Sequence, residues 1–294
     1  MTRLRKVVVC GVGLIRGSFA LALKEAGAAE ELVGVGRSRA TLDQAQKLGV
    51  IDRSTSDWGD ALAGADLVLL AMPVGQMEPV MSGMAPHLGP STLITDGGST
   101  KQDVIAAARK AFGPQIGQFI PAHPIAGAEK SGVAAAQADL YRGKRVILTP
   151  LVENSAASLA RLRQIWESCG AQVSELAPDE HDSTFAAVSH LPHLLAFALV
   201  HLFAGRENSG QLFSFAAGGF RDFTRIASSH PEMWRDICVA NRAALIKELD
   251  AYQNELLRTR VLLAQADGDG LAAMFGSARA RRDAWLESMP PPGE

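Results

Sequence analysis

The sequence has little of what marks disulfide-rich, zinc-binding or nucleic-acid-binding proteins. Its three cysteines, Cys10, Cys169 and Cys238, lie far apart, with no CxxC pair and no Cys/His cluster at metal-ligand spacing. Basic and acidic residues nearly balance, 29 against 31, so the formal net charge is only -2. We therefore expect a reduced setting, no metal, no nucleic-acid partner, and a protein that acts on small molecules.

Export and membrane signals are also missing. The N-terminal residues MTRLRKVVVCGVG run directly into a β-branched strand, without the small-residue cleavage site of a signal peptide. The segment most similar to a membrane span, residues 185–205, is interrupted by three histidines and a proline before about 20 continuous apolar residues accumulate. We expect a cytoplasmic protein with no membrane partner, in which residues 185–205 form a buried helix.

The length of 294 residues and the strand pattern predict two domains. Short apolar or β-branched runs alternate with helical patterns, which is typical of parallel βαβ units. A helix over 155–169 and a strand over 171–176 close this half. We predict an α/β fold: a Rossmann-type nucleotide-binding domain over 1–178, an all-helical dimerisation domain over 179–288, and a disordered tail over 289–294. The predicted strands are 7–10, 32–35, 66–72, 92–95, 119–122 and 145–150.

Strand signals end at the predicted boundary, and residues 231–266 are predicted to form one long helix that begins at Pro231. Apolar side chains recur along it at helical spacing, so one stripe should be buried. At ~1.5 Å per residue such a helix is on the order of 50 Å long, more than one small helical domain can cover. A homodimer is therefore expected. The stripe consists of Leu245, Leu249, Tyr252 and Leu256.

A glycine turn, GVGLIRGS over residues 11–18, joins the first strand to an alanine-rich helix. Gly11 permits the tight turn, Gly13 lets a pyrophosphate approach, and the N–H groups of Leu14 and Ile15 at the helix start can receive it. We predict dinucleotide binding. Arg16 occupies the third fingerprint position, where glycine is usual, so a glycine turn that binds nothing is the alternative.

The residues after the second strand favour NADP over NAD, with NAD left open. That strand ends at Gly36, about 25 residues after Gly11, where an NAD-selective domain carries an acidic residue for the ribose. This chain has Arg37, Ser38 and Arg39 there instead, which suit a 2′-phosphate. Alternatively, Ser38 is a helix N-cap and the two arginines are solvated surface charges.

Three later motifs carry a family resemblance: DGGSTK at 96–101, HPIAGAEKSG at 123–132 and SHLPH at 189–193. With the glycine turn and GFRDFTRIA at 219–227, they resemble the prephenate/arogenate dehydrogenase family, the cyclohexadienyl dehydrogenases of tyrosine biosynthesis, over nearly the whole chain. The resemblance implies oxidative decarboxylation of prephenate to 4-hydroxyphenylpyruvate or of arogenate to tyrosine, with hydride transfer to the nicotinamide cofactor.

The resemblance also implies catalytic roles for two of these residues. His123 would bond the ring hydroxyl and take up its charge, and a histidine of ordinary pKa near ~6.5 is a neutral acceptor at cellular pH. Ser99 would lie near the same hydroxyl and the nicotinamide. Ser99 and Gln102 equally form an S-x-x-Q capping box at a helix start.

Four further residues are predicted to bind substrate. Arg225 matches a family arginine that holds a substrate carboxylate. His190 and His193 are three residues apart and fall on one helix face, and Pro192 between them predicts a kink. Glu129 is expected in an ionic network at the cleft mouth. Ala128 stands where many relatives carry threonine, which leaves the choice between prephenate and arogenate open.

Two other functions stay open. Arg16 in the glycine position is compatible with a non-catalytic NADP-binding sensor. A dehydrogenase of the β-hydroxyacid type has a similar two-domain plan but relies on a catalytic lysine. Loss of turnover on replacing His123 would favour the first interpretation, a prephenate/arogenate dehydrogenase.

Overall fold

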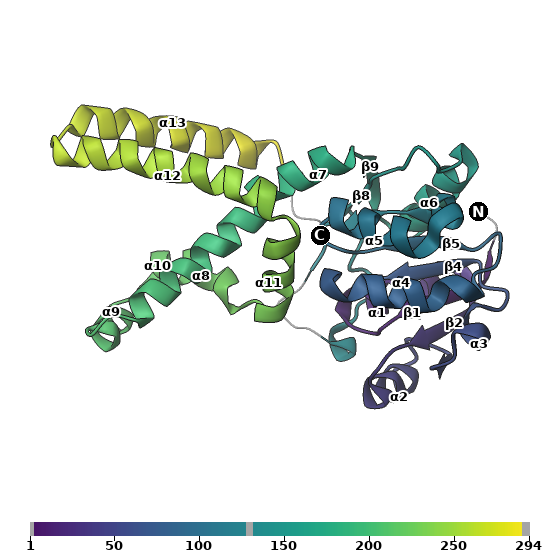
Figure 1. The fold of residues 1–294 in the computed structure, drawn as a ribbon. Helices are drawn as coiled ribbons and strands as arrows, with labels where there is room; N and C mark the ends of the chain where they lie inside the picture. The colour runs from purple at the N-terminus through teal and green to yellow at the C-terminus, as the bar shows by residue number, and fades with distance from the viewer. Residues whose placement is uncertain (1–2, 128–131, 290–294) are drawn as a thin grey trace. The chain divides into compact units, whose positions relative to one another are not determined.

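The computed structural model describes residues 3–127 and 132–289, which fall into two compact units, Met1–Arg242 and Ala243–Glu294. The first unit contains a six-stranded parallel sheet in the order β3-β2-β1-β4-β5-β6 (Figure 1). Its strands are β1 (Leu4–Cys10), β2 (Ala29–Val35), β3 (Arg53–Thr55), β4 (Leu67–Leu70), β5 (Leu93–Asp96) and β6 (Phe119–Ile120).

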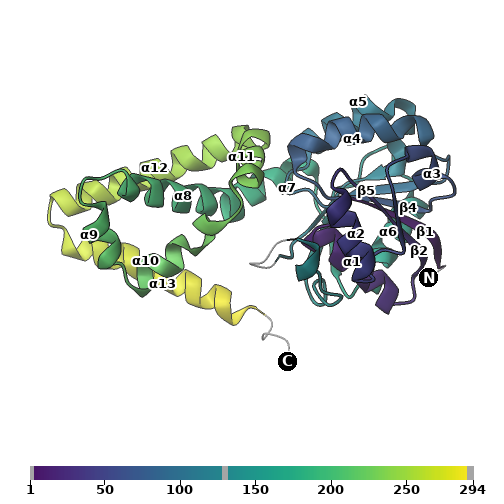
Figure 2. The same ribbon diagram turned by 90° about the horizontal axis from the view of Figure 1, so that it is seen from below.

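Helices cover both faces of this sheet (Figure 2). Val7 and Val9 of β1 pack into one hydrophobic cluster, while Val8 and Cys10 pack into the other. Because both faces are buried, the strands are continuously apolar, as in parallel sheets generally. The Rossmann-type prediction is confirmed. The first cluster includes α1 (Leu14–Glu25), α2 (Arg39–Lys47) and α6 (Ala156–Ser168), and the second α3 (Trp58–Leu62), α4 (Met77–Met84) and α5 (Gln102–Phe112).

The run predicted as one strand over 119–122 divides between two sheets. Pro121, which has no N–H to donate to a ladder, separates β6 from β7 (Ala122–Pro124). β7 pairs antiparallel with β8 (Arg145–Leu148), which pairs parallel with β9 (Gln172–Glu175). This switch places His123 on a short strand beyond the main sheet. β3 was not predicted, because its three residues show no apolar alternation.

The helical part of the first unit begins with α7 (Pro178–Phe185), which passes through a π-helical turn (Ala186–His190) into α8 (Leu191–Ala204). This turn confirms the irregularity predicted from Pro192, whose missing N–H cannot complete the regular helical ladder. The segments that follow are α9 (Ser209–Ser214), α10 (Gly218–Thr224), the short 3-10 helix η6 (Arg225–Ser228) and α11 (Pro231–Ala240).

The expectation of a buried helix over 185–205 is wrong for the single chain. Of the α8 side chains only Ala196 is buried, and Val188 and Leu202 are 66% and 54% exposed. Within this unit α8 packs chiefly on α10 and η6, which cover part of its circumference. Among the described residues, the continuous helix Pro178–Ala204 is long and apolar enough to cross a membrane, a criterion that helices of water-soluble proteins also meet.

The predicted long helix over 231–266 is two helices. α11 ends at Ala240, Asn241 leaves helical geometry with φ -98° and ψ 25°, and α12 (Arg242–Ala264) follows. The Asn241 side chain forms hydrogen bonds with residues outside these helices, and these contacts explain the break. In the second unit α13 (Gly268–Glu287) follows α12, and Thr259 contacts Met274 between them (Figure 1). Tyr252 and Leu256 of the predicted stripe are exposed in the single chain.

Candidate active site

The glycine turn leads into a helix start that no side chain caps. Gly11 adopts φ +77°, a left-handed conformation that favours glycine. Gly13 is the N-cap of α1, no side chain caps the helix, and its first turn contains no acidic residue. The first N–H groups, those of Leu14 and Ile15 included, thus lack a capping side chain, and the helix dipole favours an anion there. These residues fit the pyrophosphate of a dinucleotide.

The residues predicted to select the cofactor lie at the end of β2, and the Gly11 N–H donates to the carbonyl of Val35, the last residue of that strand. Ser38 caps α2 by accepting from the Thr41 N–H at 3.3 Å, as in the structural alternative. Arg39 pairs with Asp43 at 3.0 Å. The exposed Arg37 donates to Gln76 Oε1 at 2.8 Å, and Gln76 lies in the short 3-10 helix Val74–Gln76 that follows β4.

A buried ion pair fixes the backbone at the carboxyl edge of the sheet. Lys101 and Asp96 are both fully buried and bonded to each other. Asp96 also accepts from the N–H groups of Gly98 at 2.8 Å and Ala122 at 2.9 Å, while Lys101 Nζ donates to the Ala122 carbonyl at 2.7 Å. The pair thus ties the turn after β5 to the residue that precedes His123.

His123 stands at the end of a hydrogen-bonded chain. Its Nδ1 lies 2.9 Å from Nε2 of His181, and His181 Nδ1 lies 2.8 Å from Oδ1 of Asp182. Burial acts to raise the pKa of Asp182, but hydrogen bonds from His181, Gln102 and Lys101 outweigh burial and lower it. Asp182 is therefore a carboxylate that accepts the Nδ1–H of His181.

The same chain fixes the proton positions on His123. Burial is the main cause that holds the pKa of His123 well below 6.5, followed by repulsion from the protonated form of His181 and from Lys101. Burial also lowers the pKa of His181, although Asp182 opposes the shift. A neutral His181 that donates through Nδ1 must accept through Nε2, so His123 donates through Nδ1 and keeps a lone pair on Nε2. His123 Nε2 can therefore take a proton from a bound hydroxyl.

Asp182 also caps α5, which corrects the predicted capping box. The box required Ser99 to cap with Gln102, but the N-cap is Lys101 and no local side chain caps it. Instead, the two oxygens of Asp182 accept from the N–H groups of Lys101 at 2.8 Å and Gln102 at 2.9 Å. The helix dipole stabilises a carboxylate at the helix N-terminus, so Asp182 takes the place of a local capping side chain on α5.

His190 and His193 both lie against Trp234 of α11. The His193 ring stacks on Trp234 with centroids 3.6 Å apart, and the His190 ring meets it edge-on at 6.1 Å. His193 Nδ1 bonds the Ser189 carbonyl at 2.9 Å, which leaves Nε2 as an acceptor. Burial lowers the pKa of His193, and the nearby Arg225 lowers it further. The predicted substrate residues His190 and His193, from one segment, and Arg225, from another, thus lie close together.

Asn241 connects this pair to the His123 chain. Its Nδ2 donates to the Asp182 carbonyl at 2.7 Å and lies 3.1 Å from His190 Nδ1. Burial is the main cause that lowers the pKa of His190 to about 4. His190 Nε2 is buried without a hydrogen-bond partner among the described residues. A neutral His190 with an unsatisfied Nε2 is suited to a polar ligand group.

The structure shows no direct contact between the remaining predicted residues and the His123 chain within the described ranges. Ser99 lies half-buried in the turn between β5 and α5. Glu129 and Ala128 lie outside the described residues, as do residues 290–294 of the predicted tail. Sequence reasoning missed Asp96, Lys101, His181, Asp182 and Asn241. Asp96 and Lys101 stand in the DGGSTK motif, which could have indicated them. His181 and Asp182 are an adjacent His-Asp pair in the first helix after the predicted domain boundary. No local sequence feature distinguishes Asn241.

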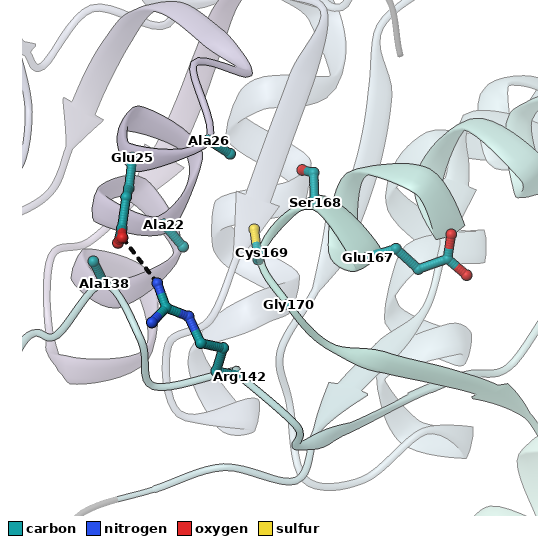
Figure 3. A pocket seen from close by; sticks show the side chains of 9 residues that line it. All are labelled: Ala22, Glu25, Ala26, Ala138, Arg142, Glu167, Ser168, Cys169 and Gly170. Carbon is teal, nitrogen blue, oxygen red and sulfur yellow. Dashed lines mark hydrogen bonds and ion pairs between the residues drawn. The ribbon is translucent and has the colours of Figure 1, made fainter. Parts of the chain in front are cut away.

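A hollow of about 300 Å³ lies away from these residues, between the end of α1 and the end of α6 (Figure 3). Glu25 and Arg142 form an ion pair across it at 2.8 Å. Burial raises the pKa of Cys169 in its wall to about 12, so this thiol is not a nucleophile at neutral pH. Within the described ranges, no three His, Cys, Asp or Glu side chains are grouped to hold a metal ion.

Both halves of the chain match known protein families. Residues 19–175 match the family described as prephenate dehydrogenase, nucleotide-binding domain, and residues 177–277 match prephenate dehydrogenase, dimerization domain. Prephenate dehydrogenase of Bacillus subtilis is 38% identical over 280 residues, 94% of this chain and 75% of that protein. Cyclohexadienyl dehydrogenase of Zymomonas mobilis is 35% identical over 284 residues, 96% of each.

Solved structures agree with the sequence comparison. The prephenate dehydrogenase of Aquifex aeolicus in complex with hydroxyphenyl propionate and NAD+ superimposes with a TM-score of 0.90 at 33% identity, over 95% of this chain and 98% of that one. The arogenate dehydrogenase of Synechocystis gives a TM-score of 0.81 at 29% identity, over 95% and 99%.

The Rossmann-type sheet, the uncapped helix start at the glycine turn and the half-buried histidine at the sheet's carboxyl edge define an oxidoreductase that uses a nicotinamide dinucleotide. Within that class, the chain belongs to the prephenate dehydrogenase family, whose members include enzymes named for prephenate, arogenate and cyclohexadienyl substrates.

Proposed function

We propose that this chain catalyses the oxidative decarboxylation of prephenate to 4-hydroxyphenylpyruvate, of arogenate to tyrosine, or of both, with NADP as the preferred acceptor. The observation that carries the proposal is the lone pair on His123 Nε2, set by the hydrogen bonds through His181 to Asp182. A base in the neutral form at cellular pH is what a cyclohexadienol needs for loss of its hydroxyl proton.

In the proposed reaction His123 Nε2 accepts the hydroxyl proton as that C–O bond gains double-bond character. The cofactor, when bound, accepts the hydride that leaves the same ring carbon. The electrons of the bond to the ring carboxylate pass into the ring, CO2 leaves and the ring becomes aromatic as a phenolate. His123 Nε2 then returns the proton to the phenolate oxygen, which gives the phenol product. Arg225 binds a substrate carboxylate through its planar fork, and His190 and His193 orient the substrate by hydrogen bonds. Ser99 orients the hydroxyl, and Glu129 holds the entrance.

The preference for NADP rests on the end of β2. No carboxylate follows Gly36 at the position that would bind a ribose 2′-hydroxyl, and Arg37 and Arg39 both stand there with exposed guanidinium groups. Their partners are an amide oxygen, that of Gln76, and a surface carboxylate, that of Asp43, which contribute little in water. A 2′-phosphate would offer both arginines a stronger partner.

We also propose a cytoplasmic homodimer, with the division into domains near residue 178. Large apolar side chains on α12 and α13 are exposed in the single chain, which is costly unless another surface covers them. The match of residues 177–277 to a dimerization domain supports a second copy as that surface. The exposed side chains include Leu256, Leu257, Val261, Leu263, Phe275 and Trp285.

The direct test is initial-rate turnover with prephenate and with L-arogenate, each with NADP and with NAD. An NADP-dependent rate with either substrate is the expected result. The His123→Asn variant serves as the matched control, since asparagine keeps a hydrogen-bonding side chain but cannot take the proton. It should lose turnover by about 100- to 10,000-fold while NADPH binding stays unchanged.

Failure of all four reactions by folded protein that binds NADPH would overturn the proposal and favour a non-catalytic sensor. A dehydrogenase of the β-hydroxyacid type would need a catalytic lysine. Lys101, the lysine beside His123, does not fit that role, because the Lys101 Nζ is fully buried and bonded to Asp96 and to the Ala122 carbonyl.

A further inference from the structure

The glycine turn contains a side chain that the dinucleotide fingerprint does not provide for. The Arg16 guanidinium folds back over the turn, and Nη1 donates to the carbonyl of Cys10, the last residue of β1, at 2.6 Å. A Cβ added to Gly11 would lie 2.4 Å from Arg16 Nη1, and one added to Gly13 would lie 3.4 Å from Nη2. The guanidinium therefore lies directly against both glycines that receive a pyrophosphate in this motif.

This guanidinium has no compensating charge in the described part of the chain. The ionisable groups that act on it are the side chains of Cys10 and Tyr141. Burial raises the pKa of Cys10 to about 12 and that of Tyr141 well above 10, so both are neutral at pH 7. Among the residues that the structure describes, Arg16 Nε is buried with no hydrogen-bond partner. A half-buried cation with one carbonyl acceptor and a buried, unsatisfied Nε donor is costly unless an anion joins it.

We propose that Arg16 is a ligand of the cofactor's pyrophosphate, which supplies the missing negative charge. The two glycines and the α1 N-terminus then provide the cradle, and Arg16 adds a charged donor where the usual fingerprint has a third glycine. Gly17, the next residue, takes over close packing, because a Cβ there would lie 2.8 Å from the Ala136 Cβ. The inference depends on nicotinamide cofactor binding and does not require turnover.

The test measures binding by isothermal titration calorimetry, with NADPH, ADP-ribose and adenosine as probes. ADP-ribose contains the pyrophosphate and adenosine lacks it. Arg16→Met keeps length and removes charge, and Arg16→Gly restores the usual fingerprint. Both should weaken NADPH and ADP-ribose binding by about 10- to 100-fold, the effect of losing a hydrogen bond to a charged group, and leave adenosine binding unchanged. Arg142→Met, which removes an exposed arginine of the same unit, should bind all three probes like the wild type.

The opposite result is equally clear. If Arg16→Met or Arg16→Gly binds NADPH as tightly as the wild type or more tightly, Arg16 is an obstacle and the proposal is overturned. Equal losses for adenosine and ADP-ribose would also overturn it, because they indicate general damage. Thermal unfolding of the cofactor-free variants checks folding, and Arg16→Lys, which keeps the charge without the planar fork, should give an intermediate loss if Arg16→Met does not fold.

A failed turnover assay would not affect this test. Wild-type protein that binds ADP-ribose through Arg16 but converts neither cyclohexadienol would contradict the proposed function alone. Wild-type turnover together with unchanged affinity in Arg16→Met would contradict the Arg16 inference alone.

Discussion

At the scale of single residues, His181 is a positioning residue whose role can be separated from stability. In the His181→Phe variant, His123 loses the acceptor for its Nδ1–H, so kcat should fall by about 100-fold or more while NADPH affinity is kept. The acid limb of the kcat profile, which reports protonation of His123, should move to higher pH, because the protonated form of His181, present at that acid pH, is one of the groups that lower the pKa of His123.

The conservative variant His181→Gln offers a carbonyl oxygen to His123 and should recover part of the rate. Replacement of the exposed His201 on α8 by phenylalanine is the control and should leave the profile in place. A His181→Phe enzyme that is slower but has an unmoved acid limb would show that His181 acts only in packing.

The cofactor preference depends on Arg37. Because the Arg37 guanidinium is exposed and its hydrogen bond within the described ranges goes to a neutral amide, the Arg37→Ala variant should lose little stability. NADPH affinity should fall by about 10-fold and NADH affinity should stay the same, since only NADPH carries the 2′-phosphate. Calorimetric Kd values for both cofactors measure this, with Arg3→Ala as a control at an exposed arginine elsewhere. Equal losses for the two cofactors would assign Arg37 a structural role.

At the scale of elements, the Lys101–Asp96 pair joins β5, α5 and β7. Lys101→Met would leave the Asp96 carboxylate buried without its cation, and we expect the free energy of unfolding to fall by about 3–5 kcal/mol. The double variant Asp96→Asn/Lys101→Met, which removes both charges, should recover part of that loss. Urea unfolding of both variants measures the difference. A loss below about 1 kcal/mol in the single variant would mean that the pair contributes little.

Elements could be predicted where local pattern and tertiary environment agree. The apolar runs of β1, β4 and β5 are buried on both faces, so their composition alone indicated parallel strands. The prediction was wrong where a distant side chain changed the local outcome. Asp182 caps α5 from about 80 positions away in sequence, and the contacts of Asn241 end α11 ten residues after it begins. No window of sequence contains both partners of such contacts.

The same limit applies to the candidate site. His123, His190 and His193 were predictable because their motifs are local, and the structure places them in one hydrogen-bonded and stacked arrangement. His181 and Asp182 gain their roles only when α7 packs beside the start of α5, which sequence periodicity does not reveal.

At the scale of the whole molecule, the buried histidines make stability depend on pH. Burial lowers the pKa of His123, His181, His190 and His193, and that of His190 to about 4. An unfolded chain protonates these side chains near pH ~6.5. Below that pH the unfolded state binds more protons than the folded state, so stability is full above pH ~6.5 and is lost as the pH falls toward 4.

The contribution of one histidine can be isolated with the His190→Asn variant, which keeps a polar side chain near Asn241 and cannot titrate. Urea unfolding at pH 7, 6 and 5 and one fixed protein concentration gives the slope of the unfolding free energy. Between pH 6 and 5 each neutral buried histidine contributes up to about 1.4 kcal/mol per pH unit, and the variant's slope should be shallower by nearly that amount. The exposed His201→Asn control should keep the wild-type slope. If the His190→Asn slope equals that of the wild type, His190 is protonated in the folded protein at these pH values, and its Nδ1 could not then accept from Asn241 Nδ2.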